Sequence, residues 1–185
     1  MTRLVDHDVV LRAFRPDELS RLVELTRATP SDDGVHWGPR SESELRERID
    51  RSGTWSNGQL SFAVESEGRL VGEVQARNHR GAMPPGVFEL GIELYEEADR
   101  GRGLGSSAIR GITRYLFERE DAHRVQLSTD VENRAMRRTA ERLGFAFEGV
   151  LRRFMPTRRG PRDYAMYALT RDDWEHVKET WTRTS

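Results

Sequence analysis

Cysteine is absent from the 185-residue sequence, which excludes disulfide bonds, thiolate nucleophiles and zinc sites built on cysteine ligands. Long apolar runs are absent as well. No segment approaches the roughly 20 residues that cross a bilayer, and the first residues lack the apolar core of a signal peptide. We therefore expect a cytoplasmic protein with neither a membrane partner nor a bound metal.

The chain also has little net charge. Its 30 basic and 31 acidic residues are interspersed and leave a net charge of −1, so nucleic-acid binding is not expected as its main task. Hydrophobic residues make up 36% and recur at regular intervals, which indicates a globular chain rather than a disordered one. The length fits a single domain spanning residues 1–185.

Hydrophobic periodicity predicts strands and helices that alternate along the chain. The predicted strands are Val9–Phe14, Leu60–Glu65, Leu70–Arg77, Val87–Leu94, Arg124–Val131, Phe147–Met155 and Tyr164–Leu169. The predicted helices are Pro16–Ala28, a helix from Ser41 to near Gly53, Gly103–Glu120, Asn133–Leu143 and Arg171–Thr182. A hairpin region followed by β-α-β-α-β predicts the α/β (α+β) class, with a mixed sheet of about seven strands covered by helices.

The segment Arg100-Gly-Arg-Gly-Leu-Gly-Ser106 lies between a predicted strand and a predicted long helix. Its glycines let backbone N–H groups approach an anion, and the N-terminus of the following helix adds partial positive charge. Arg100 and Arg102 add formal positive charge. The spacing matches neither the dinucleotide-binding fingerprint nor a Walker loop. The segment is therefore either a phosphate site or a glycine-rich turn that only begins a helix.

Two motifs resemble those of one family, the GNAT acetyltransferase superfamily. Arg100, Gly103 and Gly105 match the pattern Arg/Gln-x-x-Gly-x-Gly/Ala of its acyl-CoA pyrophosphate loop. Asn133 and the Leu-Gly-Phe sequence ending at Phe145 match a second segment at the expected separation. The resemblance covers nearly the whole chain, and residues 148–153 and 163–174 look like the branch of ribosomal-protein N-terminal acetyltransferases. It implies the GNAT acyl-CoA acyltransferase fold, whose central sheet is mostly antiparallel.

The resemblance implies that acetyl-CoA is the co-substrate, and it assigns residues to that molecule. The pyrophosphate is expected at the glycine loop, which consists of Arg100, Gly101, Arg102, Gly103, Leu104, Gly105 and Ser106. The strand end Ile92, Glu93 and Leu94 is expected to pair with the pantetheine arm, and Asn133 is expected to contact it. From the residues alone, Asn133 is equally suited to be the N-cap of the helix that follows it.

Acetyl transfer requires a neutral amine. An α-amino group has a pKa of about 8 and needs only a modest base, whereas a lysine side chain has a pKa of about 10.4. Glu89 and Glu93 share one face of a predicted strand, and Glu89 matches the position of a basic glutamate in related enzymes. Either glutamate is alternatively a solvated or ion-paired strand residue. The histidines His36 and His79, in predicted loops, are further candidates.

The general acids usual in the family are missing. The positions where relatives carry a tyrosine or a serine hold Ala140 and Met136. Tyr164 is our candidate for the general acid, with Tyr167, Tyr95 or water as alternatives. A free thiol has a pKa of about 8.5, so a thiolate can depart without full protonation.

The sequence defines the acceptor less well than the donor. His36, Trp37, Trp55 and the arginine-rich segment 152–162 are expected to border the acceptor site, although the tryptophans are equally suited to packing helices onto the sheet. The leading hypothesis is acetylation of a protein N-terminus. The alternatives are a small-molecule amine (a polyamine, an amino acid or an antibiotic) and a non-catalytic acyl-CoA-binding protein. Members of the branch often form homodimers, but no exposed apolar stripe in this sequence indicates one.

Overall fold

The computed structural model describes residues 2–28, 41–78 and 83–183, and its centre is one eight-stranded sheet. The strands are β1 Leu4–Asp6, β2 Val9–Arg12, β3 Gln59–Ser66, β4 Arg69–Arg77, β5 Val87–Leu94, β6 Arg124–Asp130, β7 Ala146–Met155 and β8 Arg162–Thr170. The helices are α1 Leu19–Ala28, α2 Glu42–Arg51, α3 Leu104–Arg119, α4 Arg134–Arg142 and α5 Arg171–Arg183. The expected α/β fold is confirmed.

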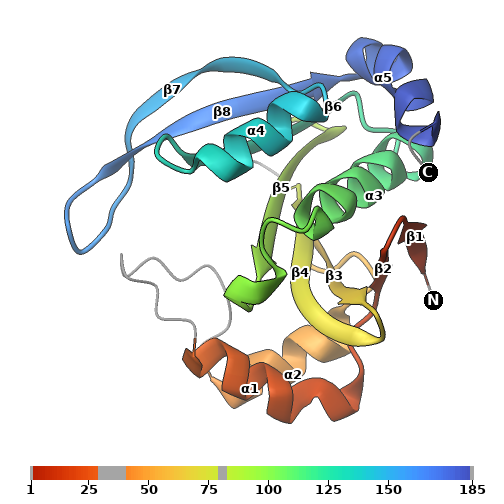
Figure 1. Cartoon of the computed structure of the whole chain (residues 1–185), viewed down its shortest axis with the longest axis vertical. Coiled ribbons are helices and arrows are strands. Elements are labelled where there is room, and N and C mark those ends of the chain that lie inside the picture. Colours follow the sequence, from red (N-terminus) through yellow and green to blue (C-terminus); the bar gives the residue numbers. More distant parts are fainter. Residues whose placement is uncertain (1, 29–40, 79–82, 184–185) are drawn as a thin grey trace.

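The strands are arranged in the order β1-β2-β3-β4-β5-β6-β8-β7. Every pair of neighbouring strands in this sheet is antiparallel except the central pair, β5 and β6, which is parallel. A parallel pair cannot be joined by a tight turn and needs a crossover connection. Here α3 is that crossover, and Figure 1 shows it running alongside β5.

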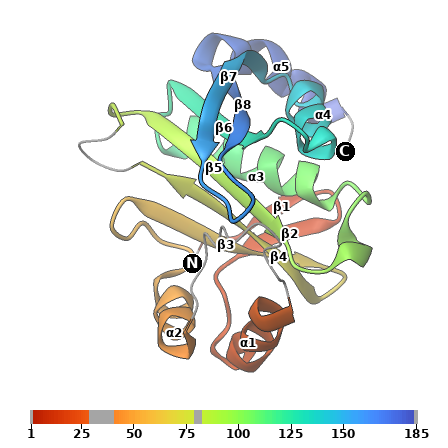
Figure 2. The ribbon, with the colours of Figure 1, turned by 90° about the vertical axis from the view of Figure 1, so that its left-hand side faces the viewer.

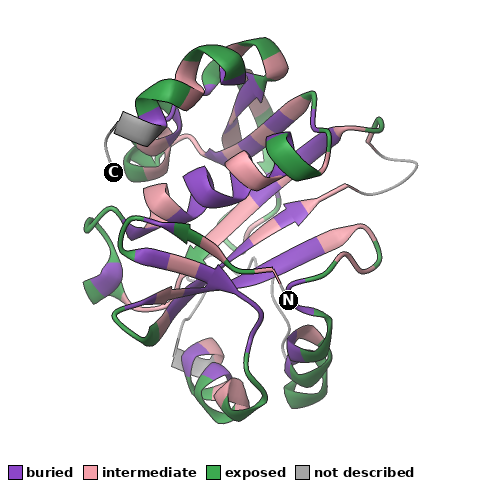
Figure 3. Cartoon of the chain, turned by 90° about the vertical axis from the view of Figure 1, so that its right-hand side faces the viewer, coloured by how far each residue is buried: buried purple, intermediate pink, exposed green. Residues whose placement is uncertain are grey.

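Helices cover both faces of the sheet, as Figure 2 shows, with α1 and α2 on one side and α3, α4 and α5 on the other. The larger core cluster joins the second group to the sheet through residues such as Ile112, Ala140 and Trp174. A smaller cluster joins α1 and α2 to it through Leu22 and Leu45. The buried strands between them form the middle layer (Figure 3). None of the helices in the described part of the chain is long and apolar enough to span a membrane.

Local sequence signals set several element boundaries. The capping box predicted for α2 is present, because Ser41 Oγ accepts from the Glu44 amide while the Glu44 carboxylate accepts from the Ser41 amide at 2.9 Å. The helix α4 ends before Gly144, whose φ of 83° is left-handed. A Cβ at this position would also lie 2.9 Å from Val177 Cγ1, so glycine is required there for the approach of α5 as well.

The strand β1 is absent from the sequence-based expectation of about seven strands. It has three residues, which are too few to show an alternating pattern. Its position depends on a distant contact: buried Asp6 accepts a hydrogen bond of 2.9 Å from Nε of Arg110 on α3. The additional strand is therefore a product of tertiary packing rather than of local propensity.

Candidate functional site

The two central strands separate part-way along their length. The strands β5 and β6 pair only from Val87–Leu90 to Arg124–Leu127. Beyond that point β5 continues beside β4 as far as Leu94, and β6 continues beside β8 as far as Asp130. Figure 1 shows β5 running away from β7 and β8 in this region. Among residues 2–28, 41–78 and 83–183, no strand pairs with the facing edges of residues 91–94 and 128–130, and we call the space between these edges the wedge.

The glycine loop places the N-terminus of α3 at the open end of the wedge. Gly101 and Gly103 have φ angles of 74° and 86°, which favour glycine over other residues. Gly103 is the N-cap and has no side chain to cap the first amides of α3. A Cβ on Gly105 would lie 3.7 Å from Ile92 and 3.8 Å from Leu94, so the helix starts against the end of β5. Uncapped N–H groups and the helix dipole make this point suitable for an anion.

The two loop arginines have different surroundings. Arg100 Nη2 donates to the Leu94 carbonyl at 3.5 Å, which places its guanidinium beside the wedge. Arg102 is held behind the loop by Asp99 and by Glu67, each at 3.4 Å. Asp99 is buried, and its Oδ1 also accepts from Arg69 at 2.9 Å. The side chain of Arg102 therefore contributes to loop structure, while Arg100 contributes its charge nearer to the open strand edge.

Asn133 lies at the start of α4 and acts as its N-cap. Its Oδ1 accepts from the Met136 amide at 3.1 Å, so the structural role expected from the sequence is present. The helices α3 and α4 approach each other where Ser106 Oγ lies 3.5 Å from Thr139 Oγ1. The start of α3 therefore contacts the second half of α4, and the two helices lie on the same face of the sheet.

Glu89 and Glu93 point to the other face, the one that α1 and α2 cover, because strand residues alternate. Glu89 lies level with the paired part of the two strands and has 27% of its side chain exposed. It is 3.5 Å from Arg77 Nη2 and accepts from Gln126 at 3.3 Å. The exposed Glu93 lies in the unpaired part of β5, about 13 Å further along the strand. One reacting atom therefore cannot lie beside both carboxylates.

Glu93 faces a second carboxylate that the sequence analysis did not single out. Glu73 of β4 lies directly opposite it in the strand register and is only 2% exposed. Arg48 of α2 donates to Glu73 at 2.6 Å, and Gln75 donates to it at 2.8 Å. Burial raises the pKa of Glu73 to about 7, although Arg48 opposes that change. The only local signal is a charged residue between Gly72 and Val74 in a buried strand.

The three tyrosine candidates for the general acid have different surroundings. Tyr164 is half-buried on β8, opposite Asp130 at the end of β6, and faces the same side of the sheet as Glu93. Tyr167 is fully buried, and its hydroxyl is engaged with Glu141 at 2.9 Å and with Arg137 at 3.2 Å. Burial raises the pKa of Tyr95 well above its usual value, so this phenol stays neutral.

Of the three residues His36, Trp37 and Trp55 expected at the acceptor site, only Trp55 lies within the described part of the chain. Trp55 packs against Phe88 with ring centroids 5.5 Å apart and belongs to the edge of the main core. Phe88 is near the start of β5, about 20 Å along the strand from Leu94. Trp55 thus has the packing role that the sequence left open. His36, Trp37 and His79 lie outside the described residues.

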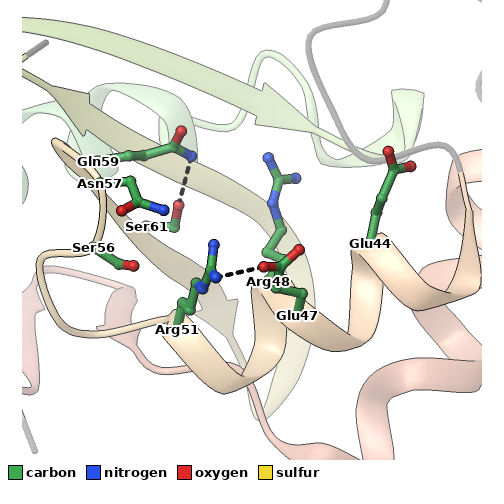
Figure 4. A pocket seen from close by; sticks show the side chains of 8 residues that line it. All are labelled: Glu44, Glu47, Arg48, Arg51, Ser56, Asn57, Gln59 and Ser61. Carbon is green, nitrogen blue, oxygen red and sulfur yellow. Dashed lines mark hydrogen bonds and ion pairs between the residues drawn. The ribbon is translucent and has the colours of Figure 1, made fainter.

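A pocket of about 220 Å³ opens between α2 and the start of β3. Its lining residues are Glu44, Glu47, Arg48, Arg51, Ser56, Asn57, Gln59 and Ser61. Figure 4 shows the side chain of Arg48 extending from α2 toward the strands on which Gln59 and Ser61 lie. Within the described part of the chain, no cluster of His, Cys, Asp and Glu is arranged to hold a metal.

Comparison with known families agrees with this geometry. Residues 8–146 match the family model described as the acetyltransferase (GNAT) domain. The chain belongs to the GNAT acetyltransferase family. A curated relative, the putative ribosomal N-acetyltransferase YdaF of Bacillus subtilis (strain 168), is 27% identical over 187 residues, which cover 94% of this chain and 97% of the relative.

Other relatives extend the same likeness. One is the uncharacterized N-acetyltransferase YokL, derived from the SPbeta prophage of Bacillus subtilis (strain 168). It is 25% identical over 177 residues, which cover 95% of this chain and 97% of YokL. RimL, a ribosomal alpha-N-protein acetyltransferase solved in complex with coenzyme A, shares the fold. It has a TM-score of 0.75 and 20% identity, with 91% of this chain and 97% of RimL covered.

The buried Glu73 predicts a pH-dependent stability. Its pKa is about 7 in the folded protein and about 4.5 when exposed, so folding favours the protonated carboxyl. The resulting stabilisation is complete below pH 4.5 and is lost as pH rises through 7. Relative to Glu73→Gln, the wild-type free energy of unfolding should fall by about 3 kcal/mol between these values. Urea unfolding at a series of pH values measures this difference, and a constant difference between the two proteins would contradict it.

Proposed function

We propose that the chain transfers an acetyl group from acetyl-CoA to the α-amine of a protein N-terminus. The observation that carries this proposal is the uncapped N-terminus of α3 beside the open edge of β5. A helix end of this kind favours a phosphate group, and an unpaired strand edge favours an extended chain with amide groups. Coenzyme A has both features, a pyrophosphate and a pantetheine arm with two amides.

The residues around the wedge fit such a molecule. The backbone of Arg102, Gly103, Gly105 and Ser106 is placed to bind the pyrophosphate, with Gly101 and Leu104 shaping the loop and Arg100 adding charge. Ile92 and Leu94 offer main-chain groups on the edge that faces away from β4, whereas the carbonyl of Glu93 and the amide of Tyr95 face β4. Asn133 uses Oδ1 for its cap, which leaves its side-chain amino group to donate to the pantetheine arm.

The amine reaches the thioester from the opposite face of the sheet, where Glu93 lies. We propose Glu93 as the base, because it is exposed beside the unpaired strand segment and no described residue forms an ion pair with it. Glu89 is the alternative, as the family resemblance implies. Its carboxylate is already in contact with Arg77 and Gln126, which leaves it less available to an incoming amine. A backbone N–H near Leu94 is placed to stabilise the developing oxyanion.

Tyr164 is our proposed proton donor for the departing thiolate. It faces the same side of the sheet as Glu93, from the strand next to β6. Tyr167 is already engaged by Arg137 and Glu141 under α4, which argues against it. Because a thiolate is a reasonable leaving group, this residue contributes less than the base.

Two arguments support a protein N-terminus as acceptor. The curated relative YdaF carries the name of a ribosomal N-acetyltransferase. An α-amine is also partly neutral at cellular pH, which suits an exposed carboxylate such as Glu93 as the base. On this proposal the protein works in the cytoplasm, where nascent and ribosomal protein N-termini are found.

Thiol release from acetyl-CoA tests the activity and the acceptor class together. The panel consists of peptides with free N-termini, the same peptides with blocked N-termini and an internal lysine, and small amines such as polyamines. We expect release with the free N-terminal peptides and acetylation of the α-amine by mass spectrometry. Release with small amines alone would move the acceptor to that class, and binding of CoA without release from any amine would refute catalysis.

Gly103→Ala tests the cofactor site. The φ of 86° strains any other residue, and the added methyl points into open space beside the first amides of α3. We expect the Kd for CoA to rise by about tenfold or more, measured by calorimetry. Gly160→Ala is the matched control, because its φ of 108° also strains any other residue, its Cβ also meets open space, and it lies in the turn between β7 and β8. Equal CoA affinity in both variants would remove the loop from the site.

Paired substitutions identify the base. We expect Glu93→Gln to lower kcat by about a hundredfold with little change in the Kd for CoA, because the carboxylate acts on the amine and not on the donor. Glu89→Gln should lower kcat less, since Glu89 is already engaged by Arg77 and Gln126. Steady-state kinetics with a free N-terminal peptide measures both. A larger loss in Glu89→Gln would transfer the role to Glu89.

A further inference from the structure

The proposed transfer releases one proton per turnover. An acceptor ammonium gives its first proton to the base, and the nitrogen lone pair then forms a bond to the thioester carbon. The carbon–sulfur bond breaks, and a second proton from nitrogen ends on the thiol. The products are an amide, a neutral thiol and one proton that the base must lose before the next turnover.

Glu73 is the titratable group next to the proposed base. The register places it directly across from Glu93 on neighbouring antiparallel strands, where Cβ atoms lie about 5 Å apart. Like charges in such positions repel each other, and Glu93 does raise the pKa of Glu73. A charged Glu93 therefore favours the protonated form of Glu73.

The groups that face Glu73 come from each neighbouring element. Arg48 reaches it from α2 at 2.6 Å, and Gln75 of its own strand donates at 2.8 Å. Ser61 of β3 also hydrogen-bonds to the carboxylate. On β5 the charged or titratable neighbours among the described residues are Glu93 and Tyr95. Because burial raises the pKa of Glu73 to about 7 and Arg48 opposes that change, Glu73 can gain and lose a proton near neutral pH.

Glu73 also has a connection to solvent away from the wedge. Ser61 and Arg48 both touch its carboxylate and both line the pocket between α2 and β3 (Figure 4). Gln59 continues the polar path by donating to Ser61 at 3.0 Å. The carboxylate of Glu73 thus lies between Glu93, which faces the proposed reaction, and a water-accessible pocket behind it.

We propose that Glu73 accepts the released proton from Glu93 and passes it through Ser61 to solvent in the pocket beside α2. The inference rests on the proposed function. It assigns to Glu73 a positioning role, since it acts on the reaction through Glu93 and touches neither substrate. A pKa of about 7 suits this role, because Glu73 is then half ionised at neutral pH and can accept a proton.

The competing explanation is structural, with the Arg48–Glu73 ion pair only fixing α2 to the sheet. The pH dependence of kcat separates the two explanations. At saturating substrates, wild-type kcat should fall about tenfold from pH 8 to pH 6, since Glu73 becomes protonated. In Glu73→Gln the plateau should drop and this pH-dependent step should vanish, while Glu73→Asp should restore a step. A structural role changes the melting temperature of the variants and leaves the step in place.

Arg48→Gln provides a second test, which applies even where Glu73→Gln does not fold. Loss of the positive charge disfavours the ionised carboxylate, so the step should move to higher pH. Arg46→Gln is the matched control, because Arg46 forms an exposed ion pair with Glu42 on the same helix. In this variant the pH-dependent step in kcat should stay at its wild-type position. A step that persists in Glu73→Gln, or one that does not move in Arg48→Gln, overturns the role of Glu73. Absence of acetyl transfer in the wild type overturns the proposed function instead.

Discussion

A parallel strand pair at the centre of an antiparallel sheet determines how the rest of this molecule is arranged. Pairing β5 with β6 in parallel requires a crossover helix, so α3 must begin where β5 ends. Because the same two strands separate beyond Leu90 and Leu127, the helix start faces an unpaired edge rather than a closed sheet. The anion site and the open strand edge are therefore two results of one topological choice.

The second constraint is the approach of β4 to β5 along the wedge. A Cβ on Gly72 would lie 2.3 Å from the Glu93 carbonyl oxygen, so a side chain there would displace the end of β5. The next residue, Glu73, has its carboxylate out of water and held by Arg48. Burying an ion pair costs desolvation energy and adds little net stability. The presence of Glu73 in this strand therefore agrees better with the proton transfer proposed for it than with a stabilising role.

Local signals in the sequence were sufficient for much of the fold, including the glycine loop and the start of α3. The glycine loop, the capping box at Ser41 and the helix end at Gly144 depend on contacts within a few residues, and these expectations hold. Glu73 and Arg48 are 25 residues apart, so only the packing of α2 on the sheet brings them together. The ring of Trp55 packs against Phe88, and nothing local in the sequence distinguishes a core tryptophan from one that lines a site.

The wedge also has a consequence for the folding stability of the protein. The two inner edges of the sheet carry backbone N–H and C=O groups that have no partner in a neighbouring strand of the described sheet, and a ligand that pairs with one edge supplies hydrogen bonds to those groups. Any molecule that binds the folded chain alone shifts the folding equilibrium by mass action, by about 2.7 kcal/mol at a hundred times its Kd. On the proposed function, the folded chain is therefore stabilised by its own co-substrate, and its stability rises with the concentration of acetyl-CoA.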